Sequence, residues 1–355
     1  MCFLGAISLK QFILKFVKIF RVVLLALFVE GHVFAVFAQT HSCAAASHYK
    51  IIALPLQPAR INNSGLIVGT TAPTDEDHKA AVWTEKDGLR VVELPAGFIS
   101  AEPLGVNSAG DFVGTASRGA NQFLAFAYVG GKFSLLAEQP EVHASRSRAM
   151  AINDSGDVAG QSGENLMVWR KQKALPLGGC CGGIAHGINN RGQVVGQFND
   201  KQGHYAAFVW DAAHGLQSIA PLKSASSMAV AINEKGHVLL KSFTPNAVFL
   251  RREGKLTNVE LSTEFASQPL ALNDCDVIVG EFGASSEWNH AFIWDEQHGF
   301  RNLNTLVDAG AEWNLETALS INDRGEIVGI GDRGGTQDVG YLLVPEKGVT
   351  TKDTK

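Results

Sequence analysis

The sequence predicts an all-β protein, a seven-bladed β-propeller of four-stranded blades. Three observations predict this fold. A ten-residue phrase recurs along the chain, for example "AINDSGDVAG" at 151–160 and "GINNRGQVVG" at 187–196. Apolar runs are short, rich in β-branched and aromatic residues and bounded by Gly, Asn and Asp, which is typical of strands. No helical 3.6-residue periodicity persists after residue 38.

Residues 1–38 predict a secretory signal peptide that precedes the fold. A basic start is followed by the apolar run "VVLLALFV" at 22–29 and by the small residues of "FAVFAQT". We therefore expect cleavage after Ala38 and secretion to the periplasm or the exterior. An uncleaved membrane anchor is the alternative, but Glu30 and His32 interrupt an apolar run that is short for a bilayer.

The charge of the chain excludes one broad class of partner. The formal net charge is −5, and loss of the basic signal segment would leave about −8 on the mature chain. Proteins that bind nucleic acid are normally basic, so we expect no nucleic-acid partner. We expect a monomer that meets a membrane only through its signal segment, and whose partner is an unknown protein or glycan.

The recurring phrase aligns on the Asn of "IN" and divides the chain into seven units. The seven copies are Asn62, Asn107, Asn153, Asn189, Asn233, Asn273 and Asn322. A glycine follows three residues later at Gly65, Gly110, Gly156, Gly192, Gly236 and Gly325, whereas unit six has Asp276. Asn can bond its own backbone in an Asx turn, and Gly, or less readily Asp, adopts positive φ. Seven copies indicate a structural turn rather than a catalytic residue.

Each unit then supplies four predicted strands, a to d. Strand a is "A-x-x-I-N", strand b "x-V-V-G", strand c "A-F-x-W" and strand d "G-L-x-x-L". A second glycine closes strand b in every unit except unit five, which has Leu240. Tryptophans recur in strand c, so we expect them in the core; they are Trp83, Trp169, Trp210 and Trp294.

The two ends of the repeat array predict a closed ring. The last unit ends at "GYLLVP" without a strand d, while "YKIIALPL" at 49–56 resembles "LRVVELP" at 89–95. The N-terminal strand would thus complete the last blade, whereas a superhelical β-solenoid would need capping repeats. The predicted propeller spans residues 49–345, after a linker at 39–48 and before a polar tail at 346–355.

These units resemble the bacterial HAF-repeat family of probable extracellular repeat proteins. The resemblance covers nearly all of residues 49–345 and includes the eponymous His290-Ala291-Phe292. The ending "NLNTLVDAGAEWNLETALSINDRGEIVGIG" is similar to the last repeat of that family, whereas units two, three and five are irregular. The resemblance implies secretion and a repeat fold, and it implies no reaction.

Antiparallel blades would place the a–b and c–d turns on one face of the ring. The b–c and d–a loops would lie on the other face, where propellers usually bind ligands.

The cysteines offer two possible disulfides. Cys180 and Cys181, in the "GGCCGG" of a d–a loop, can form a strained vicinal disulfide or remain two free thiols. Cys43 and Cys275 would lie near adjacent blades, so a bridge between them is possible after export.

Two further groups of residues are candidates for ligand contacts. The acidic loop "TDEDHK" at 74–79 could offer Ca²⁺ oxygen ligands at Asp75 and Asp77, but a solvated loop explains it more simply, so no metal or cofactor is expected. Trp288 and Trp313 do not recur in the repeat and would lie on the loop face of neighbouring blades. They form either an aromatic platform for a sugar or peptide, or ordinary loop packing.

The predicted function is a secreted, non-enzymatic binding or surface module. No nucleophile motif or phosphate-binding loop stands outside the repeat pattern, so no catalytic residue is predicted. A propeller hydrolase or lyase and a structural envelope protein remain the alternatives. Converging titratable residues at the channel mouth would favour the enzyme, an aromatic patch the binding module, and a featureless polar mouth the scaffold.

Overall fold

The computed structural model describes residues 45–346, except 72–77, 120–121, 138–145, 172, 179–181, 223–224, 262–265, 284–289 and 309–311. The predicted signal peptide and nearly all of the polar tail therefore lie outside the described residues. The described residues contain 28 strands and one short 3-10 helix, η1 (Leu303–Thr305). None of their helices is long and apolar enough to cross a membrane.

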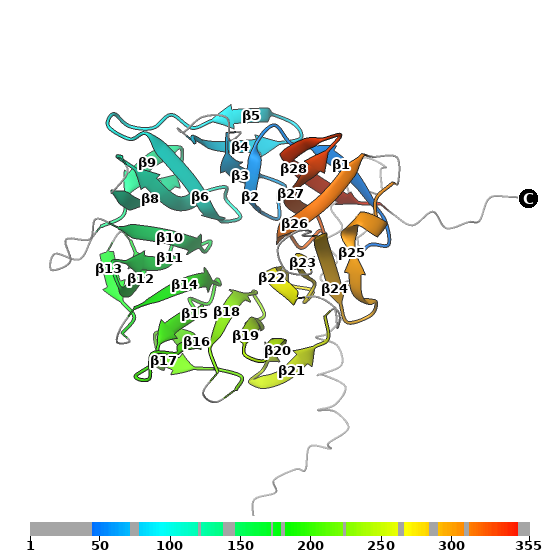
Figure 1. Cartoon of the computed structure of the whole chain (residues 1–355). Helices are drawn as coiled ribbons and strands as arrows, with labels where there is room; N and C mark the ends of the chain where they lie inside the picture. The colour runs from blue at the N-terminus through cyan, green and yellow to red at the C-terminus, as the bar shows by residue number, and fades with distance from the viewer. Residues whose placement is uncertain are drawn as a thin grey trace, which may run out of the picture. The chain divides into compact units, whose positions relative to one another are not determined.

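The strands form seven four-stranded antiparallel sheets, as the sequence predicts, and the sheets are arranged in a ring (Figure 1). Blade one contains β2 (Gln57–Ile61), β3 (Ile67–Thr70), β4 (Ala80–Thr84) and β5 (Gly88–Val91). Blade two contains β6 (Ser100–Val106), β7 (Phe112–Ser117), β8 (Phe123–Val129) and β9 (Lys132–Leu135). Blade three contains β10 (Ser147–Ile152), β11 (Val158–Ser162), β12 (Asn165–Arg170) and β13 (Lys173–Pro176). Blade four contains β14 (Gly183–Ile188), β15 (Val194–Asn199), β16 (Tyr205–Asp211) and β17 (Gly215–Ser218).

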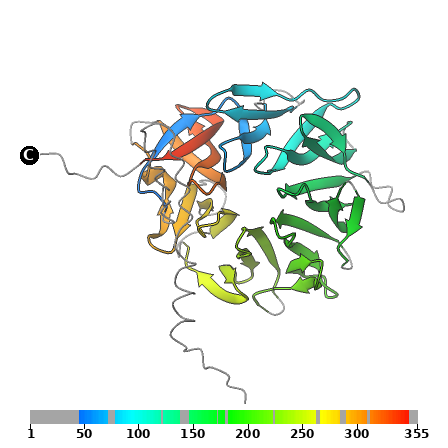
Figure 2. The ribbon, with the colours of Figure 1, turned by 180° about the vertical axis from the view of Figure 1, so that it is seen from behind.

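The remaining blades follow the same order around the ring, which Figure 2 shows from behind. Blade five contains β18 (Ser227–Ile232), β19 (Val238–Phe243), β20 (Asn246–Arg252) and β21 (Lys255–Val259). Blade six contains β22 (Ala266–Leu272), β23 (Ile278–Gly283), β24 (His290–Asp295) and β25 (Gly299–Asn302). Blade seven contains β26 (Trp313–Ile321), β27 (Ile327–Arg333), β28 (Thr336–Pro345) and β1 (Tyr49–Ala53).

The ring closes through the N-terminal strand, as predicted. β1 pairs with β28 in an antiparallel register that runs from Tyr49 opposite Pro345 to Ala53 opposite Tyr341. Tyr49 is buried and its N–H donates to the Leu306 carbonyl at 2.8 Å. Ala45, in the predicted linker, is also buried in the core of this blade. The first ordered strand therefore holds the last blade in the ring.

The turn between strands a and b has the backbone that the sequence predicts. The residue three positions after the repeat Asn has positive φ in all seven blades. Asp276 adopts φ 60° at this position, where the other six units have glycine. The N–H of this residue donates to the carbonyl of the repeat Asn, at 2.9–3.1 Å in every blade. The repeat phrase thus encodes one tight turn seven times.

Every innermost strand also contains a β-bulge that the sequence reading did not anticipate. The register with strand b skips one residue, three positions before the repeat Asn. The skipped residues are Ala59, Leu104, Met150, His186, Val230, Leu270 and Leu319. A bulge bends its strand and redirects a side chain, which explains how this position comes to line the ring axis in several blades.

The second glycine of the phrase is required by close packing of strands a and b. A Cβ at Gly114 would lie 1.9 Å from the Glu102 carbonyl oxygen, and one at Gly196 would lie 2.0 Å from that of Ile184. Blade five is the exception because Leu240 occupies this position, where its side chain is fully buried in an apolar cluster with Val209.

The hydrophobic core lies between adjacent blades. Val68 and Val82 of blade one pack with Phe112 and Phe126 of blade two, and similar clusters fill the other blade interfaces. The recurring tryptophans of strand c contribute as expected. Trp83 and Trp169 are buried, and Trp210 and Trp294 are partly buried against blade-interface clusters.

We predict that β1 is essential for stability. A chain that begins at residue 54 lacks the buried Tyr49 and leaves β28 as an unpaired edge, so its free energy of unfolding should fall by about 4 kcal/mol or more. A chain that begins at residue 45 keeps β1 and is the matched control. Urea unfolding of both chains gives the comparison, and equal stabilities would show that β1 does not close the ring.

Candidate functional site

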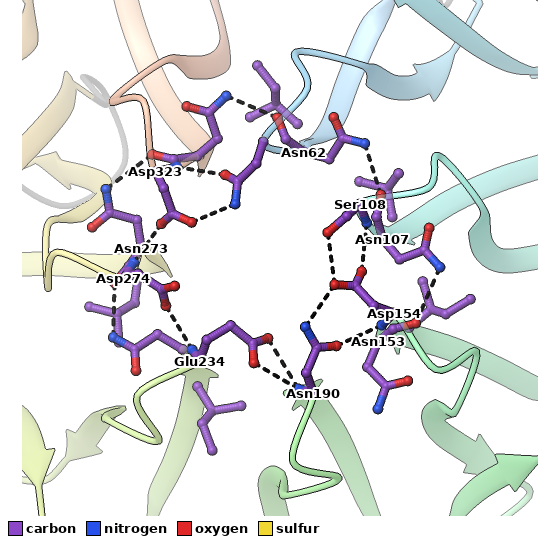
Figure 3. A pocket seen from close by; sticks show the side chains of 18 of the residues that line it. Asn62, Asn107, Ser108, Asn153, Asp154, Asn190, Glu234, Asn273, Asp274 and Asp323 are labelled. Atoms are coloured by element: carbon purple, nitrogen blue, oxygen red, sulfur yellow. Dashed lines mark hydrogen bonds between the residues drawn. The ribbon is translucent and has the colours of Figure 1, made fainter. Parts of the chain in front are cut away.

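The seven repeat asparagines form a closed ring of hydrogen bonds around the axis, called here the Asn ring. Figure 3 shows members of this ring, among them Asn62, Asn107 and Asn273. The side-chain Nδ2 of each Asn donates to the backbone carbonyl of the corresponding Asn in the next blade. The seven distances, from Asn62 to Asn107 and so on around to Asn322 and back to Asn62, are 2.9, 3.3, 3.1, 3.2, 3.0, 3.1 and 3.0 Å. One residue type thus links every blade to its neighbour.

The other side-chain atom of each Asn holds its own turn. In all seven blades Oδ1 accepts the N–H of the residue four positions later, at 2.9–3.1 Å. The seven side chains are only 1–6 % exposed. Because an unpaired polar atom at a buried site costs about 1–3 kcal/mol, neither half of the amide can be lost cheaply.

The residues that follow the asparagines form a second ring, the outer ring, at the mouth of the channel. They are Asn63, Ser108, Asp154, Asn190, Glu234, Asp274 and Asp323. In six successive contacts the backbone N–H of one member donates to the side chain of the member in the next blade. For example, the Glu234 N–H lies 2.8 Å from the Asp274 carboxylate.

Four carboxylates therefore face this mouth, and their surroundings affect them differently. Burial raises the pKa of Glu234 and of Asp274, and the neighbouring carboxylates add to both shifts. Burial would also raise the pKa of Asp154, but hydrogen bonds from Ser108 and Asn190 lower it overall. Each of these three carboxylates also accepts a backbone N–H, so they contribute to holding the blades.

Below the Asn ring the channel becomes apolar. The residues that precede the asparagines form an aliphatic ring: Ile61, Val106, Ile152, Ile188, Ile232, Leu272 and Ile321. These seven side chains line both a cavity of about 300 Å³ at the outer-ring mouth and a second cavity of about 240 Å³ deeper in the channel. The "I-N-D" of the repeat therefore specifies an aliphatic layer, an amide layer and a polar layer in succession.

The deeper cavity, called the central cavity, has a mixed wall. Five of the seven bulge residues line it, and four of them are the apolar Leu104, Met150, Val230 and Leu270. His186 is the fifth and Arg60 is a further lining residue. The Nε2 of His186 is buried and has no hydrogen-bond partner among the described residues. Arg60, His186 and Ser320 thus contribute polar side chains to a chamber whose other described lining residues are apolar.

Burial, with the help of nearby positive charges, keeps the imidazole of His186 neutral. Burial lowers the pKa of His186 to about 4, and the positive charges of Arg60 and Arg148 act in the same direction. Burial also lowers the pKa of Arg60. An arginine remains protonated even so, which gives the chamber a positive potential.

The predicted cysteine site is only partly within the described residues. Cys275 lies in the a–b turn of blade six, as predicted, and is disulfide-bonded. It packs against the cluster that contains Ala45 and Tyr49. Cys43, Cys180 and Cys181 lie outside the described residues, so the bridge between Cys43 and Cys275 stays a prediction, as does the vicinal pair.

Of the predicted aromatic and metal-site residues, only Trp313 lies within the described residues. Trp313 is the first residue of β26 rather than part of the preceding loop. It is half-buried, with Arg333 5.6 Å over its ring and Tyr341 packed edge-on at 6.1 Å. Trp288, Asp75 and Asp77 lie outside the described residues, and so does much of the b–c and d–a loop face. Within the described ranges no group of three or more His, Cys, Asp or Glu side chains could hold a metal ion.

Sequence reasoning missed the residues of the channel, although a signal was present. An Asx turn accepts Asp or Ser as well as Asn, so the use of Asn in all seven units indicates that its N–H₂ is also needed. His186 and Arg60 also had a signal. Each is the only basic residue at its position of the repeat. The other units have Gly, Ala or Ser at the position of Arg60 and apolar residues at the position of His186.

The fold and channel define a seven-bladed β-propeller, and comparison with known proteins supports this class without specifying a family. No family model and no curated protein matches the sequence. The similarity to HAF repeats therefore stays a prediction.

Solved structures are similar in fold. The virginiamycin B lyase from Staphylococcus aureus is 11 % identical, with 83 % of this chain and 99 % of that chain covered and a TM-score of 0.56. The β-propeller domain of the trilobed protease from Pyrococcus furiosus is 12 % identical, with 85 % and 95 % covered and a TM-score of 0.55. The Swd1 β-propeller domain from Myceliophteria thermophila is 11 % identical, with 84 % and 99 % covered and a TM-score of 0.55. At such identities the similarity shows the fold alone.

We predict a pH dependence of stability that arises from His186. Its pKa is about 6.5 in an unfolded chain and about 4 in the fold. Between these values the unfolded chain binds more protons, so stability falls as pH falls. From about pH 7 to about pH 4.5 the natural protein should lose about 2 kcal/mol more than a His186→Leu variant.

The measurement is urea unfolding of both proteins at the two pH values. Leucine is the natural residue at three other bulge positions, so the variant retains an aliphatic wall. An identical pH dependence in the two proteins would show that His186 is not buried in its neutral form.

Proposed function

We propose that this protein is a secreted, non-enzymatic binding module that takes its ligand into the axial channel. The observation that carries the proposal is the central cavity, whose lining includes the side chains of Arg60 and His186. Buried polar groups normally have hydrogen-bond partners. Among the described residues, only one guanidinium nitrogen of Arg60 donates to a protein acceptor, the Ala59 carbonyl, so donors of Arg60 remain for a ligand.

The channel favours binding over the two alternatives. The carboxylates Asp154, Glu234 and Asp274 accept backbone N–H groups of adjacent blades, so they are poorly placed to act as acids or bases. An imidazole whose pKa is about 4 is a weak base at neutral pH. A purely structural ring gains nothing from Arg60 and His186, because the other blades have Gly, Ala or Ser at the position of Arg60 and apolar residues at the position of His186.

Secretion is supported by the disulfide of Cys275, since disulfides persist mainly in oxidising compartments. The partner would be a protein or glycan whose terminal group enters the channel. The b–c and d–a loops of the loop face differ in length and sequence from one repeat to the next, which is consistent with such a partner. Trp313 contributes less to our proposal than the sequence suggested, because Arg333 and Tyr341 pack against its ring.

The test is a glycan and peptide array probed with residues 39–355. We expect selective binding that is lost or weakened at least tenfold in an Arg60→Gln variant. The matched control is Arg90→Gln, which changes an arginine on the outermost strand β5 of the same blade and should bind as the natural protein does. Binding that survives Arg60→Gln but disappears in Trp313→Ala would move the site from the channel to the loop face.

A further inference from the structure

Arg60 has most of its hydrogen-bonding capacity unused. One guanidinium nitrogen, Nη1, donates to the Ala59 carbonyl at 2.8 Å. Within the described part of the chain no carboxylate forms an ion pair with Arg60, although five ion pairs between an arginine and a carboxylate occur elsewhere in it. A guanidinium has five N–H donors in a planar fork, so several point to no protein acceptor.

His186 lies on the wall of the same cavity, from blade four, whereas Arg60 comes from blade one. Arg148 of blade three is close enough to the imidazole for its charge to act on it. None of the described residues that line the central cavity is acidic. Blades one and four thus contribute Arg60 and His186 to one chamber, without a balancing anion among the described lining residues.

The remainder of the wall determines the body of the ligand. Leu104, Met150, Val230 and Leu270 line the cavity, and the aliphatic ring lies between it and the outer ring. A cavity of about 150 Å³ accommodates benzene, so about 240 Å³ suits a ligand of about eight to ten non-hydrogen atoms. The carboxylates of the outer ring repel anions, so an anionic ligand would enter from the opposite, loop-bearing mouth.

We propose that the central cavity binds a small organic monocarboxylate with an apolar body, held by Arg60 and His186 at its carboxylate and by the aliphatic wall along its hydrocarbon. This rests on the proposed function, because it names the ligand class of the same channel. The carboxylate matches the guanidinium fork. An inorganic phosphate would bury two charges among aliphatic side chains, and desolvation of the second charge disfavours it.

The experiment is isothermal titration calorimetry of the purified protein with hexanoate, which has eight non-hydrogen atoms. Hexanol, hexylamine and inorganic phosphate are the comparison probes. We expect one saturable hexanoate site, with each comparison probe at least tenfold weaker. Loss of one charge-assisted hydrogen-bonding partner is worth roughly tenfold or more, so Arg60→Gln and His186→Leu should each weaken hexanoate binding to that degree. Arg90→Gln should leave it unchanged.

A second measurement keeps the proposal falsifiable if a channel variant does not fold. The chain has four methionines, of which Met150 lines the central cavity and Met167 is fully buried in a blade-interface core. With ¹³C-methyl methionine in the natural protein, hexanoate should shift the Met150 signal and show contacts to it. The Met167 signal should stay in place.

Several outcomes would overturn the proposal. They are absence of saturable hexanoate binding, equal affinity for hexanol, an unchanged affinity in Arg60→Gln, and an unperturbed Met150 signal. Any of these, together with array binding that depends on Arg60, would show that the channel binds ligands of another class. Failure of the array as well would overturn the proposed function itself.

Discussion

The side-chain amide of the repeat asparagine is the constraint on which this structure depends. Its oxygen fixes the turn within a blade, and its N–H₂ group ties that turn to the next blade. Seven such residues close a circle of buried hydrogen bonds around the axis. Blade cores alone would let neighbouring sheets slide or tilt, because apolar packing is not directional. The Asn ring adds a directional bond at the narrowest radius, where a small displacement alters the channel most.

The layering of the channel follows from this constraint. Each repeat Asn has a fixed position along the channel axis, so the residues before and after it have fixed positions as well. Seven copies of one tripeptide therefore form three stacked rings. The bulge three positions earlier then places one more side chain of five blades on the wall of the central cavity. Most blades use this position for an aliphatic residue, whereas blade four uses His186. The repeat therefore keeps the residues that stabilise the ring the same in every blade. The blades differ chemically at the bulge position, as at His186, and at the position after it, as at Arg60.

Much of the fold was predictable from the sequence, and the channel was not. The conformation of a turn depends on its own few residues, so the positive φ of Gly65 and of Asp276 could be predicted from residue type. Strand count and the completion of the last blade by Tyr49–Ala53 followed from the repeat register. The Asn ring, the bulges and the meeting of Arg60 with His186 depend on which strand is innermost and on curvature. The spacing of residues in the sequence shows neither the innermost strand nor its curvature. Arg60 and His186 come to line one cavity only when the ring closes.

The most direct test of this account is the free energy of unfolding of Asn153→Asp, measured by urea denaturation beside Asn190→Asp. Aspartate keeps the oxygen that holds the turn and replaces the Nδ2 that reaches the Asn189 carbonyl with a carboxylate oxygen, which cannot donate to it. Asn190→Asp adds the same charge at the same mouth and also removes an Nδ2 hydrogen bond, to Asp154, but on an exposed side chain. A closed Asn ring predicts that Asn153→Asp is less stable than Asn190→Asp by about 2 kcal/mol. Equal stabilities would contradict it, because the amide would then serve its own turn and nothing beyond it.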